Sequence, residues 1–534
     1  MRHKQTDEHP HHCKVPNHQF VYVDAAAVVR RLFILPGEVS LSFQTKGEVS
    51  RGHSSYGYEL LERTEVSPSS EGPNIKSFQM QHGSALGGSH AVSGTGKQTK
   101  VKEMIEQVIS RRNMHLAYRQ VLANKGSAGI DGMPVRELKP HLRKEGEAIV
   151  LSMIQGRYLP QPILGVHIPK PGGKTRLLGI PTVVDRWLQQ SVAQAITPLF
   201  EYEFKDHSYG FRPDKNAHQC VQQSQHYIEE GYQHIVDIDL RNFFDEVDHC
   251  LLLQLLYRKV KCPLTLRLIR KWLRAPILIN GKLTRRRKGV PQGSPLSPLL
   301  SNIMLHELDK ELERRGWKWV RYADDFSIYT KSKYEAGKTE KVTRAFLKER
   351  LQLTVNAEKS GTRKPVQFSI LGYRFVPAYE KGIKGKYQLV VSEKSWDKLK
   401  QSLKAITRKT APLSIAERIH KLKEAGRGWL QYFRMASIVG KLRDLDGWIR
   451  NRLRYCIWHD WKKPERKRKN LMRLGVDHSH AYAWSRTRMG GWAVAQSPIL
   501  VTTITLERLK KRGYESLHDY YLNVSPGLNE PLYT

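Results

Sequence analysis

The chain has 534 residues, which is long enough for about three or four domains. Its 89 lysines and arginines outnumber the 51 aspartates and glutamates, and the formal charge of +38 predicts salt-sensitive binding to a polyanion. Five scattered cysteines favour a reduced, cytosolic setting over a disulfide framework, and the absence of an apolar run of about 20 residues predicts no membrane span.

Residues 1–98 show neither helical nor strand periodicity, and we interpret them as a flexible extension. His9, His11, His12 and Cys13 are close enough in sequence to bind a metal ion, but a flexible histidine-rich tail is the simpler interpretation.

A basic hairpin is predicted over residues 168–177, with the sequence IPKPGGKTRL. Its Pro-Gly-Gly sequence is typical of a tight turn, and Lys170 and Arg176 place one cation on each arm. Nucleotidyl transfer needs positive charge near the triphosphate, which this hairpin can supply. A solvated basic turn is the alternative interpretation.

A strand is predicted over residues 234–240, with the sequence HIVDIDL. Its apolar side chains fall on one face, and two aspartates, Asp237 and Asp239, share the other. The strand pattern stops at Arg241, and a helix is expected to begin near Phe244.

A proline-rich turn with the sequence PQGSPLSP occupies residues 291–298 and includes Gln292 and Gly293. Apolar residues at helical spacing follow it as far as Leu308, which predicts a helix after the turn.

The sequence Tyr322-Ala323-Asp324-Asp325 lies between two runs of alternating character and predicts a tight hairpin with two carboxylates at its tip. An Asp-Asp pair is common in surface turns, but adjacent carboxylates repel each other, and a bound Mg²⁺ would remove that cost. Two-metal phosphoryl transfer takes carboxylates from separate elements around ions about 3.5–4 Å apart. Asp239 is therefore the expected partner.

Three amphipathic helices are predicted between residues 394 and 460, and the second begins with a Ser414-x-x-Glu417 capping pattern. A dense cationic run follows, which suits phosphate binding but is also typical of a solvated arm. Its candidate RNA-binding residues are Lys462, Lys463, Arg466, Lys467, Arg468 and Lys469.

The basic hairpin, the strand with Asp239, the proline-rich turn and the Tyr-Ala-Asp-Asp hairpin are followed by Lys359 and by the segment ILGYRF at 370–375. In this order, these motifs resemble those of reverse transcriptases. The segments 124–133 (NKGSAGIDGM) and 208–213 (SYGFRP) are similar to the fingers of proteins encoded by bacterial group II introns. The helices after residue 394 resemble the thumb, or maturase domain, of the same proteins.

The resemblance implies that Asp239, Asp324 and Asp325 are catalytic and bind two Mg²⁺ ions. Asp237, which lies off the motif, is interpreted as a structural or supporting residue. Phe244 is implied to lie under the sugar of the incoming nucleotide, where a flat ring excludes a 2′-hydroxyl by steric exclusion.

The remaining site residues are also implied by the resemblance. Lys170 and Arg176 would contact the triphosphate, and Gln292 the nucleotide. Lys359 matches a proposed general acid for the pyrophosphate leaving group, with a merely solvated lysine as the alternative. Further motif positions are Tyr322, Ala323, Gly293, Gly372 and Tyr373.

The predicted fold class is α+β, a right-hand polymerase. The expected layout is an unmatched extension (1–98), fingers and palm (99–385), a helical thumb or maturase domain (386–460) and a basic DNA-contact domain (461–534). The expected functions are RNA-directed DNA synthesis and assistance to splicing and intron mobility in the bacterial cytoplasm, in association with RNA or the nucleoid. The implied partners are the intron RNA, an RNA template with a DNA primer, target DNA and deoxynucleotide triphosphates.

Two alternative functions stay open: a reverse transcriptase reassigned to host defence or repair, and an RNA-binding splicing helper whose polymerase has decayed. Cys456 is the only cysteine after Cys262, so no zinc-bound HNH nuclease is expected, and a nascent strand at a replication fork would supply the primer. We also hypothesise that residues 1–98 are translated intron sequence ahead of the natural start.

Overall fold

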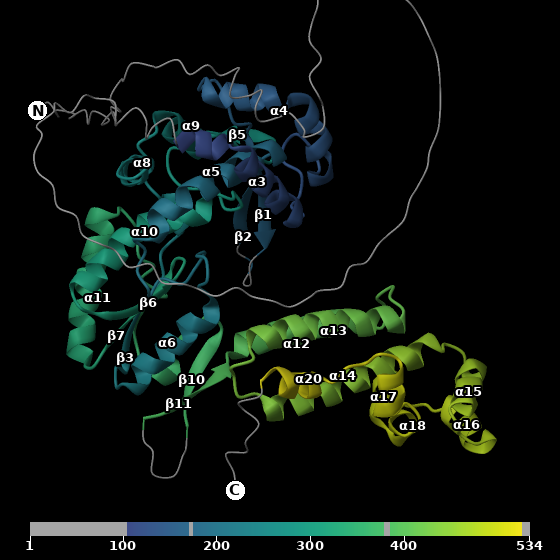
Figure 1. Cartoon of the computed structure of the whole chain (residues 1–534). Coiled ribbons are helices and arrows are strands. Elements are labelled where there is room, and N and C mark those ends of the chain that lie inside the picture. The colour runs from purple at the N-terminus through teal and green to yellow at the C-terminus, as the bar shows by residue number, and fades with distance from the viewer. Residues whose placement is uncertain (1–103, 170–172, 174, 379–384, 526–534) are drawn as a thin grey trace, which may run out of the picture.

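The computed structural model describes residues 104–169, 173, 175–378 and 385–525, and Figure 1 shows its arrangement. Over these described residues the protein is mixed α/β with three sheets, whose strand orders are β2-β1-β4-β5, β6-β7-β3-β8 and β11-β10-β9. No helix in the described ranges is long and apolar enough to cross a membrane.

The first sheet and its helices form the upper part of the molecule in Figure 1. β1 and β2 pair in antiparallel register from Leu164 with Ile180 to Pro169 with Thr175, which confirms the predicted basic hairpin. Lys170 lies outside the described residues. The elements of this part are α3 (Arg111–Ala123), η1 (Val135–Glu137), α4 (Leu138–Ile154), β1 (Ile163–Pro169), β2 (Thr175–Ile180), α5 (Val183–Glu201), α8 (His249–Tyr257), α9 (Pro263–Arg274), β4 (Ile277–Ile279) and β5 (Lys282–Thr284).

The second sheet is antiparallel and separates two hydrophobic cores. Val236 and Ile238 belong to the core that includes α10 and α11, whereas Ile235 belongs to the core that includes α6. This alternation confirms the predicted strand, which ends at Ile238. The elements are α6 (Ala217–Glu229), β3 (His234–Ile238), α7 (Phe243–Glu246), α10 (Ser297–Arg314), β6 (Lys318–Tyr322), β7 (Asp325–Thr330), α11 (Lys333–Arg350), β8 (Gly361–Arg363) and η2 (Pro365–Gln367).

Strand β6 departs from the expected half-buried alternation. Trp319, Val320 and Arg321 are all buried, although Arg321 is a cation in a run of alternating apolar and basic residues. The physical reason is an ion pair with Asp309 of α10, whose side chain is equally buried. A buried charge is tolerated when it is paired and hydrogen-bonded.

The C-terminal part is helical and follows the small third sheet. The three helices predicted between residues 394 and 460 are confirmed as α12, α13 and α14, and Ser414 and Glu417 form the predicted capping box. The elements are β9 (Ser369–Ile370), β10 (Tyr373–Pro377), β11 (Tyr387–Val391), α12 (Glu393–Ile406), α13 (Ile415–Tyr432), α14 (Val439–Asp460), α15 (Pro464–Arg473), α16 (His478–Ser485), α17 (Gly491–Gln496), α18 (Pro498–Val501), α19 (Leu506–Lys511) and α20 (Leu517–Val524).

The segment after residue 460 shares its core with the helices before it. Leu471, Leu500 and Tyr521 belong to the same hydrophobic cluster as α13 and α14, and Figure 1 shows α20 beside α14. The buried carboxylate of Asp446 on α14 accepts hydrogen bonds from the Tyr514 hydroxyl at 2.8 Å and from three further groups of residues 516–518. The C-terminal helices are therefore docked on α14.

Candidate active site

The Tyr-Ala-Asp-Asp sequence forms the predicted hairpin between β6 and β7. Tyr322 pairs with Asp325, so Ala323 and Asp324 make the turn. Ala323 has a φ of +58°, and a left-handed conformation costs a non-glycine residue on the order of 1–3 kcal/mol. The surrounding structure must therefore hold this turn in place.

The register between β3 and β7 brings the third aspartate to the hairpin. Ile238 pairs with Phe326 in the last rung of the ladder, so Asp239 and Asp325 are the next residues beyond this rung. The charge of Asp239 acts on both Asp324 and Asp325. The structure thus brings together Asp239, Asp324 and Asp325 at one end of the sheet.

The loop before β8 anchors Asp239 through residues that the sequence analysis did not identify. The Asp239 amide donates to the Ser360 hydroxyl at 2.9 Å, and the Asn356 amide donates to the Asp239 carbonyl at 2.8 Å. The Asn356 side chain also donates to Oδ2 of Asp239 at 2.9 Å. Their positions close to Lys359 were the only sequence signal for this role.

Asp324 and Asp325 lie in an environment that disfavours their charged forms. Loss of hydration and the charges of Asp324, Asp239 and Asp237 raise the pKa of Asp325 to about 6, although Lys359 opposes this change. Loss of hydration also raises the pKa of Asp324, and the positive charge of Arg176 opposes it. Arg176 of the basic hairpin therefore lies within electrostatic range of the catalytic hairpin.

The donor set fits a hard divalent cation in kind, because three carboxylates with mutual repulsion supply only oxygen ligands. Within the described residues, no group of three His, Cys, Asp or Glu side chains is already arranged to hold a metal ion. Oδ2 of Asp239 accepts a hydrogen bond from the Asn356 side chain at 2.9 Å and lies 3.4 Å from Nζ of Lys359. A cation at this oxygen would compete with both partners.

Asp237 points to the same face as Asp239 but is engaged differently. Its Oδ2 accepts a hydrogen bond from Nε of Arg363 on β8 at 3.1 Å. Burial raises the pKa of Asp237, and the Arg363 guanidinium opposes that change. This ion pair across the sheet is consistent with the supporting role expected for Asp237.

The candidate nucleotide-binding residues are joined by backbone contacts. The carbonyl of half-buried Phe244 accepts a hydrogen bond from the Val290 amide at 2.6 Å, so α7 is tied to the turn that contains Gln292. The Gln292 carbonyl accepts from the Gly179 amide of β2 at 2.8 Å. Gly293 has a φ of +119°, and a Cβ there would lie 2.5 Å from the Gly179 carbonyl oxygen, so this docking requires glycine.

The segment that contains Gly372 and Tyr373 connects the second sheet to the C-terminal helices. Gly372 has a φ of +87°, and its Cβ would lie 2.9 Å from the Ser395 hydroxyl. The buried Tyr373 donates its hydroxyl to the Tyr432 carbonyl, and the Tyr432 hydroxyl donates to the Leu371 carbonyl at 2.9 Å. These reciprocal bonds fix the hairpin against α13.

The predicted cationic run begins just before α15 and continues into its first turns, with Lys463 at the N-cap and Pro464 in the first turn. Its six candidate residues differ in accessibility. Nζ of Lys467 lies 4.3 Å from the centre of the Trp458 ring, and Arg468 pairs with Glu465. The exposed cations are Lys462, Lys463, Arg466 and Lys469.

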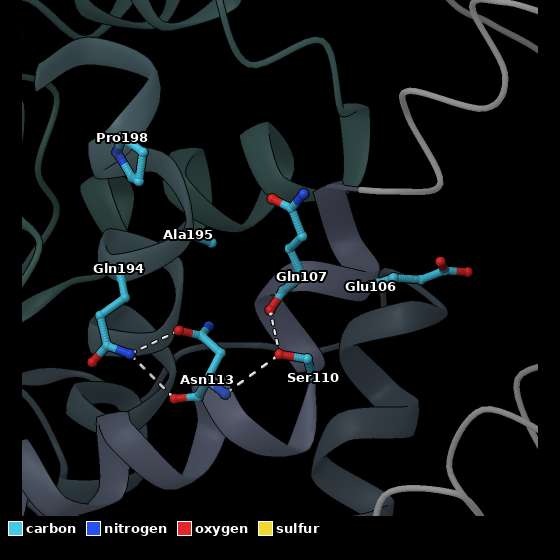
Figure 2. A pocket seen from close by; sticks show the side chains of 7 residues that line it. All are labelled: Glu106, Gln107, Ser110, Asn113, Gln194, Ala195 and Pro198. Atoms are coloured by element: carbon cyan, nitrogen blue, oxygen red, sulfur yellow. Dashed lines mark hydrogen bonds between the residues drawn. The ribbon is translucent and has the colours of Figure 1, made fainter. Parts of the chain in front are cut away.

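A separate cavity of about 480 Å³ lies between α3 and α5, and none of its lining residues belongs to the aspartate cluster. Figure 2 shows that Gln194 donates from one side of this cavity to the carbonyl and side-chain oxygens of Asn113. Ser110 donates to the Gln107 carbonyl at 3.0 Å nearby. The side chains of Ser110, Asn113 and Gln194 are thus hydrogen-bonded within the cavity wall.

Two regions of the chain match known protein families. Residues 168–375 match the family model described as reverse transcriptase (RNA-dependent DNA polymerase), and residues 396–475 match the group II intron maturase-specific domain. The second match extends through α15.

Three curated relatives are similar over parts of their length. Protein YkfC of Escherichia coli is 30% identical over 329 residues, covering 53% of this chain and 85% of YkfC. The group II intron-encoded protein LtrA of Lactococcus lactis is 34% identical over 41% of this chain and 38% of LtrA. The putative COX1/OXI3 intron 2 protein of Saccharomyces cerevisiae is 27% identical over 41% of this chain and 25% of that protein.

Proposed function

The chain belongs to the family of group II intron-encoded reverse transcriptases and maturases, and we propose that its aspartate cluster extends a DNA primer on an RNA template. The observation that carries this proposal is the register of β3 against β7, because it assembles Asp239 and the hairpin carboxylates from separate elements. Two-metal nucleotidyl transfer needs that arrangement.

Two Mg²⁺ ions, when bound, would neutralise the triphosphate and lower the barrier to attack by the primer 3′-hydroxyl. In this proposal Asp239 and Asp324 hold the ions and Asp325 completes the carboxylate set. Ser360 and the backbone of Asn356 fix Asp239 from behind. The carboxylate charges that repel one another in the protein alone would then be balanced.

The nucleotide would lie between the second sheet and the basic hairpin. The positive charge of Arg176 acts on Asp324, so it would also act on a triphosphate bound to metal ions at the aspartates. Lys170 would act from the same hairpin. Gln292 would contact the nucleotide, and the Phe244 ring would exclude a 2′-hydroxyl. Because Val290 ties Phe244 to the Gln292 turn, the two contacts would move together.

Lys359 would donate a proton to the pyrophosphate leaving group. Its side chain pairs with Asp239 and is 66% exposed. Because it is exposed, it can turn toward a ligand that enters the site. If Asp239 served as a metal ligand, the Lys359 ammonium group would be available to a phosphate oxygen. General acid catalysis of this kind contributes about 10²–10⁴-fold.

The domain layout is also inferred from this family. We propose fingers and palm over residues 99–385, a thumb or maturase domain over 386–460, and a DNA-contact domain over 461–534. The second activity would be binding of the parent intron RNA to stabilise its splicing-competent fold. The exposed cations of α15 and the high net charge suit that role and contact with target DNA, in a bacterial cytoplasm.

The test is primer extension on RNA with wild type and Asp325→Ala, combined with a splicing assay on the flanking intron. We expect synthesis only by the wild type and splicing assistance by both. A polymerase that has decayed would give splicing assistance without synthesis by either protein. Synthesis without any effect on splicing would favour reassignment to defence or repair.

A further inference from the structure

Arg321, the residue before Tyr322, is fully buried with Asp309 of α10. Its guanidinium makes two hydrogen bonds to the Asp309 carboxylate, from Nε to Oδ1 at 2.7 Å and from Nη2 to Oδ2 at 2.5 Å. This bidentate geometry uses the planar fork of arginine, which lysine cannot reproduce.

The third nitrogen of Arg321 is directed at the catalytic turn. Nη1 donates to the Ala323 carbonyl at 2.9 Å and to Oδ1 of Asn302 at 3.0 Å. The Asn302 side-chain amide donates in turn to the Gly210 carbonyl at 2.9 Å. One guanidinium therefore joins α10, the turn and the segment around Gly210.

That segment lies directly against the turn. The Arg321 amide donates to the His207 carbonyl at 2.9 Å, and the Tyr209 amide donates to the Arg321 carbonyl at 2.8 Å. A Cβ at Gly210 would lie 2.3 Å from the amide nitrogen of Ala323. The left-handed Ala323 peptide is thus enclosed by the Arg321 side chain and the Gly210 backbone.

Stability alone does not account for this pair. A buried ion pair is often no more stabilising than apolar residues of the same volume. Its other effect is geometric, because the Ala323 carbonyl that it holds belongs to the peptide that precedes Asp324. The orientation of this peptide sets the direction in which the Asp324 side chain leaves the turn.

We propose that Arg321 is a positioning residue for DNA synthesis, which fixes the Ala323–Asp324 peptide through Asn302 and Asp309. Arg321 touches neither substrate nor metal in this account. The inference rests on the proposed function, since Asp324 must act in catalysis for its placement to matter.

The test compares Arg321→Lys, Arg321→Met and Asn302→Ala with a matched control, Arg418→Met. Arg418 is also buried and donates to the backbone carbonyls of Ile406, Arg408 and Ala411, far along the chain from the turn. Two quantities are measured: kcat and KM for primer extension on RNA, and hydrogen–deuterium exchange of the peptide that spans residues 322–326.

Both Arg321 variants should lower kcat about 100-fold, the effect of a displacement of about 1 Å at a reacting centre. Asn302→Ala leaves the Arg321–Asp309 pair and the bond to the Ala323 carbonyl intact and removes the two side-chain bonds of Asn302, so it should have a smaller effect, about tenfold. KM for the template–primer should be unchanged, and exchange at the turn should accelerate in all three. Arg418→Met should destabilise the protein without changing either quantity in the folded fraction.

Wild-type exchange at the turn in Asn302→Ala and Arg321→Lys would overturn the proposal, as would losses of kcat no larger than in Arg418→Met. If Arg321→Met does not fold, Asn302→Ala decides the question. If the wild type makes no DNA, the proposed function fails, whereas the exchange data still show whether Arg321 holds the turn.

Discussion

Nζ of Lys359 lies 3.4 Å from Oδ2 of Asp239, so the proposed proton donor and a proposed metal ligand are partners in the protein alone. A cation at Asp239 would release the lysine, which couples metal binding to the availability of the acid.

Lys359→Gln should therefore lower the rate of nucleotide incorporation by about 100-fold or more, because a general acid is lost. The affinity for the deoxynucleotide should change little. Single-turnover incorporation on an RNA template measures both quantities. Lys364→Gln is the matched control, because Lys364 is also exposed, follows β8 directly and contacts His234 instead. Equal rates in the two variants would reject the acid role.

Phe244→Ala should admit ribonucleotides, because the ring no longer blocks a 2′-hydroxyl. Competition between matched deoxy- and ribonucleotides on one template gives the discrimination factor directly. Phe243→Leu serves as the control, since Phe243 contacts the same ring but is buried in the core. Unchanged sugar discrimination in Phe244→Ala would remove Phe244 from the site.

Asp325 should destabilise the metal-free protein at neutral pH. Its folded pKa of about 6 lies above the ordinary value of 3.8, so the folded state binds the extra proton between those values. The contribution of Asp325 to stability therefore falls as pH rises from about 4 through 6. Asp325→Asn should raise the melting temperature at pH 7.5, in the presence of a chelator, and not at pH 4.

Magnesium provides the check on this prediction. Added Mg²⁺ at pH 7.5 should raise the melting temperature of the wild type more than that of Asp325→Asn, because only the wild type has the full carboxylate charge to neutralise. A melting temperature of the variant equal to that of the wild type at both pH values would show that Asp325 carries no such cost.

The exposed cations at the start of α15 and just before it should contribute to the salt dependence of nucleic-acid binding. These four residues are Lys462, Lys463, Arg466 and Lys469. Each phosphate contact contributes about −0.7 for single strands or −0.9 for duplex DNA to the slope of log K against log salt. Replacing all four exposed cations with glutamine should therefore reduce the slope by about 3. Lys467→Gln is the control, because Lys467 packs on Trp458. A slope unchanged by the fourfold variant would exclude these four cations from the interface.

The sequence predicted those elements whose pattern is local. The period-two alternation before Asp239 predicted β3, and the alternation after Asp325 predicted β7. The ladder between them confirms that the two strands are neighbours. The capping pattern at Ser414 likewise predicted the start of α13. In each case the signal lies within one element: burial of one face in the strands, and capping hydrogen bonds at Ser414.

The parts that could not be predicted depend on contacts between distant segments. Asn356 and Ser360 lie more than 100 positions after Asp239, and only their closeness to Lys359 in the sequence connects them with the site. Arg321 resembled a solvent-facing cation in an alternating strand, because its partner Asp309 lies on another element. Polar residues in such networks are recognised only when the fold brings them together.

The central claim is that Asp239 acts with Asp324 and Asp325 on the growing end of a DNA strand. The most direct measurement is the rate of single-nucleotide incorporation on an RNA template by Asp239→Asn and Asp237→Asn, since both aspartates lie on one face of β3 and its extension. We predict that Asp239→Asn abolishes incorporation while Asp237→Asn, which loses only its pairing with Arg363, retains it. Incorporation by Asp239→Asn at the rate of Asp237→Asn would contradict the account.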